Sequence, residues 1–127
     1  MQAAELETFD RESYLSLATK RRDGRFVETP VWFAAMRGRL YVFTEARAGK
    51  VKRLRNFPEL RVAPCNVRGR VHGPWIEGRG RRIEDPPTVA AAYSALHRKY
   101  GWQMMLADFF SRITGRIDGR AMLEIEL

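Results

Sequence analysis

The sequence predicts a mainly β domain in which about six antiparallel strands form a small barrel with flanking α-helices. Three observations lead to this fold class. Short apolar segments follow one another along the chain and are separated by turn sequences. The 127 residues suffice for one hydrophobic core but not for two domains of ordinary size. The composition, 45% hydrophobic and 30% charged, is that of a globular protein rather than a disordered chain.

The predicted elements are joined by turns, without repeats or linkers, so we expect a single domain over residues 1–127. The pair Asp23-Gly24 is typical of a hairpin turn. Asp85 followed by Pro86 marks the start of a helix, and Gly101 marks its end. After a short N-terminal helix, the predicted strands are residues 13–20, 26–36, 39–45, 59–66, 70–84 and 121–127, and the predicted helices are residues 48–56, 86–100 and 103–114. An open antiparallel sheet with helices on one face is the alternative architecture.

Burial patterns are also predicted for these elements. The segment 26–36 is nearly all apolar after Thr29, which indicates a strand covered on both faces. Pro30 has no N–H to donate, so this strand must lie at a sheet edge or carry a bulge. Helical spacing predicts the following buried positions: Val51 and Leu54 in the helix 48–56, and Val89, Ala92, Tyr93, Leu96 and Tyr100 in the helix 86–100.

Positive charge is concentrated in one third of the chain. The net charge is +8, and residues 47–82 contain eleven Lys or Arg against two Glu, a local balance of +9. Such a concentration suggests an anionic partner, which could be a phosphate, a carboxylate tail or a nucleic acid. A solvated basic face without any partner is the alternative.

Several kinds of site are excluded because the chain lacks the residues that they would need. The chain has one cysteine and two distant histidines, so no metal-ligand spacing and no intrachain disulfide are possible. We interpret Cys65 as a packed small side chain and His97 as solvent-exposed. No apolar run approaches the ~20 residues of a membrane span. No export signal is recognisable, so we expect a cytoplasmic protein without a membrane partner.

The start of the predicted helix 48–56 is the best candidate for a binding site. Gly49, Lys50, Lys52 and Arg53 follow directly on an apolar strand pair that carries aromatic residues. A helix N-terminus presents unpaired N–H groups and a partial positive charge, which suit a phosphate. A lysine in the first turn opposes the helix dipole, and a bound anion would relieve that conflict. An ordinary exposed helix with a poorly placed lysine is the alternative.

The same region resembles the pyridoxamine 5′-phosphate oxidase-like split barrels, and more narrowly their branch of deazaflavin-dependent enzymes. The resemblance covers about residues 10–85. It rests on the segments Tyr14-Leu15-Ser16-Leu17, Thr29-Pro30-Val31-Trp32-Phe33, Leu40-Tyr41-Val42, Gly49-Lys50-Val51-Lys52-Arg53-Leu54-Arg55 and Arg61-Val62-Ala63-Pro64-Cys65.

The resemblance implies a split β-barrel that binds coenzyme F420, a deazaflavin, or alternatively FMN. The protein would then be an oxidoreductase in which the cofactor exchanges a hydride with a small organic substrate. By the same resemblance, the cofactor ring would be lined by Glu28, Thr29, Pro30, Val31, Trp32 and Phe33, the ribityl chain would be flanked by Phe43 and Thr44, and the phosphate would be held by Lys50 with Lys52 or Arg53. A homodimer is implied, with Trp102 as a candidate contribution from the second subunit.

No residue suggests itself as a catalytic acid or base, so two other functions stay open. One is a non-catalytic protein that stores or senses a flavin or haem on the same fold. The other is a nucleic-acid-binding barrel with Trp32, Phe33 or Trp75 as stacking platforms; the burial expected for the first two argues against it. The last predicted strand ends in Ile125-Glu126-Leu127 and carries none of the basic substrate-binding residues of the oxidase that makes pyridoxal phosphate, so that oxidation is not expected.

Overall fold

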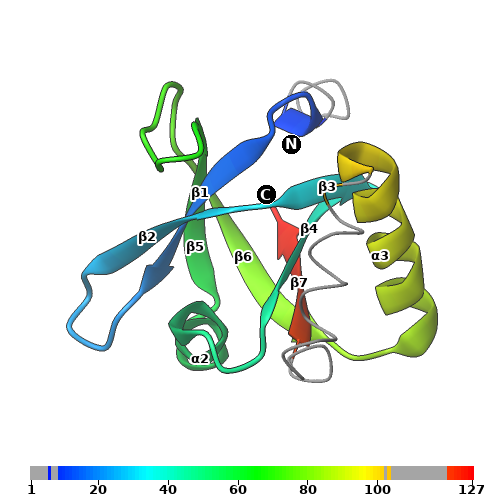
Figure 1. Ribbon diagram of the computed structural model, residues 1–127. Coiled ribbons are helices and arrows are strands. Elements are labelled where there is room, and N and C mark those ends of the chain that lie inside the picture. The colour runs from blue at the N-terminus through cyan, green and yellow to red at the C-terminus, as the bar shows by residue number, and fades with distance from the viewer. Residues whose placement is uncertain (1–5, 7–8, 102, 104–119) are drawn as a thin grey trace.

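The computed structural model describes Leu6, residues 9–101, Gln103 and residues 120–127, and these form a mainly β structure (Figure 1). The strands are β1 (Tyr14–Lys20), β2 (Phe26–Val31), β3 (Phe33–Met36), β4 (Arg39–Glu45), β5 (Glu59–Cys65), β6 (Ile76–Ile83) and β7 (Arg120–Glu126), and the helices are α2 (Gly49–Asn56) and α3 (Pro86–Tyr100). All strand pairs are antiparallel, in the order β2-β1-β5-β6-β7-β4-β3. The predicted helix 103–114 falls almost wholly outside the described residues.

The two edges of the sheet are consecutive pieces of the chain. The prediction of one strand over residues 26–36 is wrong, because Trp32 interrupts it. Before Trp32 the chain pairs with β1, and after it the chain pairs with β4, at the opposite edge. Pro30 fits the edge position that was predicted for it, since its missing N–H costs no ladder hydrogen bond there. The sheet thus curls into a barrel that hydrogen bonds do not close.

The strand predicted over residues 70–84 is shorter than expected. The structure has a strand only over Ile76–Ile83, after an irregular segment that includes an isolated bridge between Cys65 and Val71. The side chain of Asn66 accepts hydrogen bonds from the backbone N–H groups of Arg68 and Arg70, at 2.9 and 3.0 Å. Gly69 has a φ of 86°. These local bonds and the left-handed glycine favour a turn over an extended strand.

The barrel interior is filled by apolar side chains from the inner faces of the strands. Helix α2 closes one end, with Val51 and Leu54 buried as predicted. The buried members of this core are Leu6, Phe9, Leu15, Leu17, Val31, Phe33, Leu40, Val42, Val51, Leu54, Leu60, Val62, Ala121, Leu123 and Ile125. Because side chains alternate along a strand, every second residue contributes to this core.

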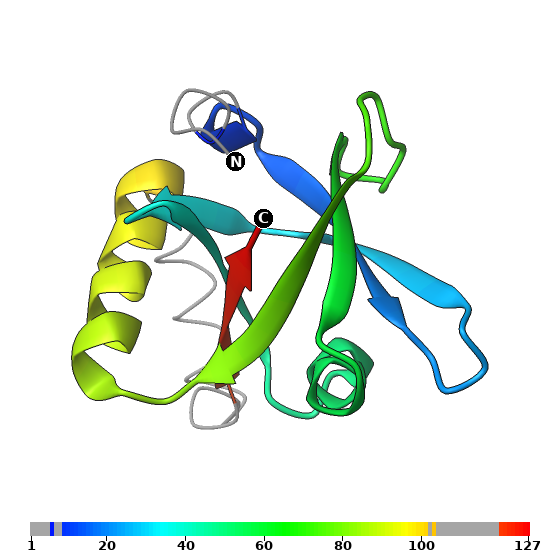
Figure 2. The ribbon, with the colours of Figure 1, turned by 180° about the vertical axis from the view of Figure 1, so that it is seen from behind.

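Helix α3 lies outside the barrel and covers the outer face of β3 and β4, as Figures 1 and 2 both show. Its predicted apolar stripe is confirmed, since Ala92, Leu96 and Tyr100 are buried and Val89 and Tyr93 pack against the same cluster. Both predicted ends are confirmed as well. Asp85 accepts a hydrogen bond from the Thr88 N–H at 3.3 Å, and Gly101 follows the last turn with a φ of 58°.

The Asp85 cap predicts a pH-dependent contribution to stability. Hydrogen bonding by the Thr88 side chain and backbone lowers the pKa of Asp85. The stabilisation is therefore fully present above the pKa of the unfolded chain and is lost as the pH falls through the folded value. Asp85→Ala should lower the melting temperature at pH 7, and the deficit should shrink in acid, as thermal unfolding across pH would show. Asp85→Asn, which caps without titrating, is the control; an Asp85→Ala deficit of constant size would contradict the prediction.

Gly78 packs too closely against β7 to carry a side chain. A β-carbon at this position would lie 2.7 Å from the carbonyl oxygen of Glu126, a backbone atom that cannot move without displacing the strand. We expect Gly78→Ala to destabilise the protein by about 1–3 kcal/mol, since overpacking forces backbone shifts. Urea unfolding measures this. Glu77→Ala, at the exposed neighbouring position, should change stability by less than ~0.5 kcal/mol; equal effects of the two would contradict the packing argument.

Candidate functional site

The predicted site residues lie around the split between β2 and β4. Strand β3 pairs with β4 from Arg39 to Val42, so within the described residues no strand flanks Phe43–Glu45 on that side. Among the described strands, β2 has a partner only on its β1 side. In Figures 1 and 2, β2 and β4 diverge and α2 lies at the far end of the opening. Backbone groups of both strands are thus available there to a bound molecule.

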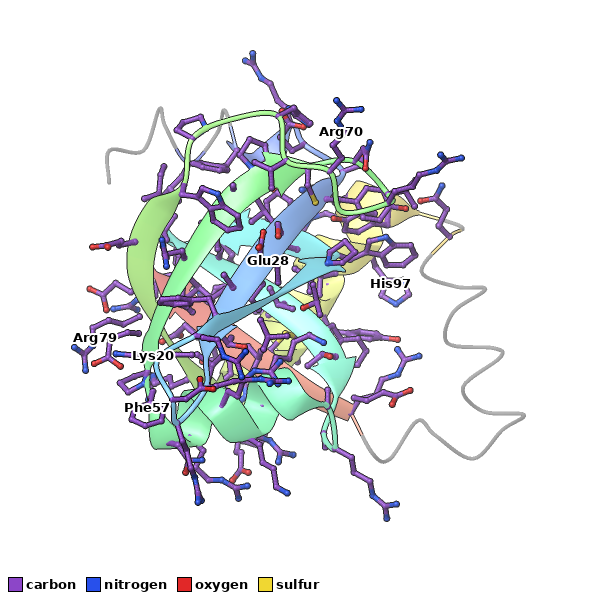
Figure 3. All side chains as sticks on the ribbon, turned by 90° about the vertical axis from the view of Figure 1, so that its left-hand side faces the viewer. Lys20, Glu28, Phe57, Arg70, Arg79 and His97 are labelled. Atoms are coloured by element: carbon purple, nitrogen blue, oxygen red, sulfur yellow. The ribbon has the colours of Figure 1, made fainter. Side chains whose placement is uncertain are left out.

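The side chains of β2 point alternately into the barrel and away from it. Thr29 pairs with Leu17 and Val31 pairs with Leu15, so both share the inner face with the core. Glu28 and Pro30 lie on the outer face and are exposed; Figure 3 shows Glu28 on this face. The Thr29 Oγ1 atom is buried, and in the described structure it has no hydrogen-bond partner. A buried hydroxyl without a partner is costly, so Thr29 marks a place where a polar ligand atom would be stabilising.

Trp32 and Phe33 are held in place by Tyr100 of α3. The indole ring of Trp32 stacks on the Tyr100 ring, with centroids 4.6 Å apart and planes 11° apart. The backbone N–H of Phe33 donates to the Tyr100 hydroxyl at 2.9 Å. That hydroxyl lies 2.9 Å from the Ser13 carbonyl oxygen and 3.0 Å from that of Phe33, and donates to one of them. Burial raises the pKa of Tyr100 well above its ordinary value, so the hydroxyl stays protonated and able to donate.

Phe33 is the least accessible of the predicted ring-lining residues. Its side chain is 0% exposed, and the Lys99 ammonium lies 3.4 Å from the centroid of its ring. Lys99 also pairs with Asp10 at 3.2 Å, and Asp10 accepts a hydrogen bond from the Ala35 N–H at 3.0 Å. Phe33 thus anchors the bend between β2 and β3, and its side chain is not available to stack on a ring or on a nucleic-acid base.

Phe43 and Thr44 point to opposite faces of β4. The Phe43 ring lies outside the barrel against Tyr93, with centroids 5.2 Å apart. Thr44 pairs with Ala121, a member of the barrel core, and so lies on the inner face. The two side chains cannot flank one ligand chain from the same surface. Only Thr44 faces the side on which Thr29 lies.

The first turn of α2 carries positive charge without a compensating acid. The N-cap residue is Ala48, which offers no side-chain hydrogen bond, and the first turn contains no acidic residue. Lys50 and Arg53 are half-buried, whereas Lys52 is exposed. Burial lowers the pKa of Lys50, as does the nearby Arg53, while Glu45 raises it. An anion at this turn would stabilise both the backbone N–H groups and the lysine.

Lys52 and Arg53 line a pocket, whereas Lys50 is not part of its lining. This pocket has a volume of about 670 Å³ and lies between α2 and the β1–β2 hairpin. The Arg53 guanidinium donates from Nε to Thr19 Oγ1 at 2.6 Å, and its Nη1 would lie 2.6 Å from a β-carbon placed on Gly49. Arg53 therefore spans the first turn of α2 and the inner face of β1. The three predicted phosphate-binding residues do not converge on one point.

Three contributors to the site were missed from the sequence. Thr19 could not be distinguished from other strand residues, and Tyr100 was recognised only as a core position. The cations Lys20, Arg21 and Arg22 are evident in the sequence, but they lie outside the basic segment 47–82, and they were interpreted only as the end of a strand and the start of a hairpin turn. Their approach to α2 is a tertiary contact, which local sequence rules do not describe.

The other polar residues that the structure describes form no further catalytic constellation. Glu124 is 7% exposed and is bound by Tyr41 at 2.9 Å and by Arg81 at 3.1 Å, as a structural pair would be. His97 is half-buried against Tyr93 rather than solvent-exposed as predicted. Cys65 is buried as predicted, and burial raises the pKa of its thiol. The described residues include no group of three potential metal ligands. None of the described helices has the length and apolar character of a membrane span.

Comparison with known proteins gives the class of fold. No family model and no curated protein sequence matches the chain. Among solved structures, HutZ, a heme storage protein from Vibrio cholerae, has a TM-score of 0.72 at 13% identity and covers 98% of this chain and 88% of its own. An FAD-binding protein from Mesorhizobium loti has a TM-score of 0.66 at 19% identity, with 100% and 88% covered. A structure named as an F420 reductase has a TM-score of 0.59 at 18% identity, with 92% and 87% covered.

These likenesses show that the chain has the split β-barrel fold of the pyridoxamine 5′-phosphate oxidase-like proteins. The fold implied by the sequence resemblance is thereby confirmed, with seven strands among the described residues in place of about six and a sheet that is not closed.

Proposed function

We propose that this protein binds a flavin-type cofactor in the split between β2 and β4, with the cofactor phosphate at the first turn of α2. The observation that carries the proposal is the uncapped, acid-free start of α2 with the half-buried Lys50 beside it. Proteins of the same fold whose names specify FAD or F420 support it. The chemistry that such a cofactor supplies when bound is hydride exchange with a small organic substrate.

The residues at the split fit such a group. The Thr29 hydroxyl is buried on the inner face of β2 and has no hydrogen-bond partner in the described structure, so a polar ligand atom that reached it would be stabilised. Strand β2 is an edge strand, so those of its backbone N–H and C=O groups that point away from β1 are free to bind the polar edge of a ring. Trp32, fixed by its stack on Tyr100, offers a rigid apolar surface beside that edge.

The protein's own contribution is binding and orientation. Lys50 holds the phosphate electrostatically, and the α2 N–H groups hold it by hydrogen bonds. The backbone of β2 orients the ring, and the apolar neighbours of Trp32 keep water from one side of it. No described side chain at the split is placed as a general acid or base, so we assign catalysis to the cofactor.

Between the two cofactors we propose coenzyme F420, with FMN as the alternative. The resemblance of the segment Gly49–Arg55 to the deazaflavin-dependent branch favours the deazaflavin, and so does the net charge of +8, because the deazaflavin is the more anionic cofactor. A homodimer that completes the site stays a prediction. The molar mass of the purified protein, measured by light scattering, tests it. The structure describes nothing of Trp102, the residue expected from the second subunit.

A titration of the dialysed protein with each cofactor tests the proposal. Micromolar or tighter binding of one of them, seen in cofactor absorbance and fluorescence, supports the site. Reduction of the bound cofactor by a physiological donor supports an oxidoreductase, whereas binding without reduction supports storage or sensing. If neither cofactor binds, the proposed function is wrong.

A further inference from the structure

The pocket between α2 and the β1–β2 hairpin is a strongly charged concave surface. It is lined by Lys20, Arg21, Arg22, Asp23, Gly49, Lys52, Arg53, Arg55, Asn56 and Phe57. Six of these residues are cations and one is an acid. In Figure 3, Lys20 and Phe57 lie near each other at this end of the molecule, while Arg70 lies at the opposite end.

The cations of this pocket are not neutralised by the protein. The carboxylate of Asp23 is turned to Arg25, which lies outside the lining and binds it at 2.8 Å. Within the part of the chain that the structure describes, none of the six lining cations forms an ion pair with a carboxylate. Burial and the nearby Arg21 lower the pKa of Arg53, as expected where like charges converge.

The shape of the pocket favours a ligand larger than a single phosphate. Its volume of about 670 Å³ lies in the range of sites for molecules of nucleotide size. One wall is the half-buried Phe57 ring, and the Lys20 ammonium lies 5.9 Å from the centroid of that ring. The cations come from two elements that face each other, so they can surround an extended anion rather than contact one oxygen.

We propose that this hairpin pocket binds a small molecule that carries a di- or triphosphate group. The site goes beyond the flavin proposal and adjoins it, because Gly49 of the same helical turn lines the pocket whereas Lys50 does not. Lys20, Arg21 and Arg22 hold the anion from the hairpin, and Lys52, Arg53 and Arg55 hold it from α2. Phe57 provides a surface against which the organic part of a nucleotide can pack.

Calorimetric titration of the full-length protein with inorganic triphosphate and with ATP tests the proposal, at an ionic strength of about 50 mM, where screening is weak. Both probes should bind, and high salt should weaken both. Tighter binding of ATP would identify a nucleotide as the source of the phosphates, and equal binding would identify the inorganic group as sufficient. The double variant Arg22→Gln/Arg55→Gln removes one exposed cation from each wall and should weaken binding at least about tenfold.

Two controls separate this site from a general charge effect and from the flavin site. Arg98→Gln, an exposed cation on α3, should change the affinity for triphosphate by less than about twofold. Lys50→Ala should leave triphosphate binding intact.

The proposal is overturned if neither probe binds, if the double variant binds as well as wild type, or if a single-stranded oligonucleotide binds more tightly than triphosphate. Full displacement of FMN by triphosphate would also overturn it, since the pocket would then be the flavin phosphate site.

Discussion

Lys50→Ala is expected to weaken binding of the flavin-type cofactor by roughly tenfold to a hundredfold, which corresponds to the loss of one charged hydrogen bond. The lysine is half-buried at the start of α2, where its charge is poorly screened by water. Lys52→Ala removes the same charge from an exposed position of the same helix and should weaken binding by less than about threefold. Fluorescence titration of both variants measures the difference; equal losses would contradict a specific role for Lys50.

The free protein gives Lys50→Ala a second signature. A lysine whose pKa is lowered in the folded protein opposes folding while it is charged in both states. This opposition declines as the pH rises above the folded value and is gone above the value of the unfolded chain. The variant without cofactor should therefore be at least as stable as wild type at neutral pH, as thermal unfolding would show. Since a bound phosphate favours the charged lysine, cofactor affinity should fall as the pH rises through the same pKa.

Tyr100→Ala is expected to cost about 3–5 kcal/mol of stability, the usual range for removing a buried aromatic ring. Tyr100 is 8% exposed and joins α3 to the bend between β2 and β3 through the Trp32 stack and the Phe33 N–H. Tyr100→Phe keeps the ring but leaves that buried N–H without its acceptor, so it should cost about 1–3 kcal/mol.

Urea unfolding of the two Tyr100 variants separates the ring from the hydroxyl. Ser94→Ala, at an exposed position of the same helix, should change stability by less than ~0.5 kcal/mol. If Tyr100→Phe were as stable as wild type, the hydroxyl would not be the group that satisfies Phe33. Because Trp32 stacks on this ring, Tyr100→Ala should also weaken cofactor binding, and Ser94→Ala should not.

The elements set by local chemistry could be predicted from the sequence. Asp85 and Gly101 delimit α3 because capping needs only neighbouring residues. The interruption at Trp32 could not be predicted, since it arises when one segment pairs with β1 and then with β4, far apart in the chain. Pro30 indicated an edge strand, but not that the strand at the opposite edge begins three residues further on, at Phe33.

The candidate site was predictable in its residue types but not in its geometry. The start of α2 could be recognised because a lysine in the first turn opposes the helix dipole, and Lys50 does lie in the first turn of α2. Thr29 and Thr44 were named with their neighbours, yet only the strand pairing shows that these two share the inner face while Phe43 turns outward. The basic hairpin could not be joined to α2 without the fold.

Comparison of FMN with riboflavin, on wild type and on Lys50→Ala, tests the central claim most directly. Riboflavin is FMN without the phosphate, so the ratio of their affinities isolates the contact at the start of α2. We predict that wild type binds FMN at least about thirtyfold more tightly than riboflavin, and that Lys50→Ala reduces this ratio about tenfold or more. Equal affinities of wild type for the two compounds, or a ratio unchanged by Lys50→Ala, would contradict a phosphate site at the first turn of α2.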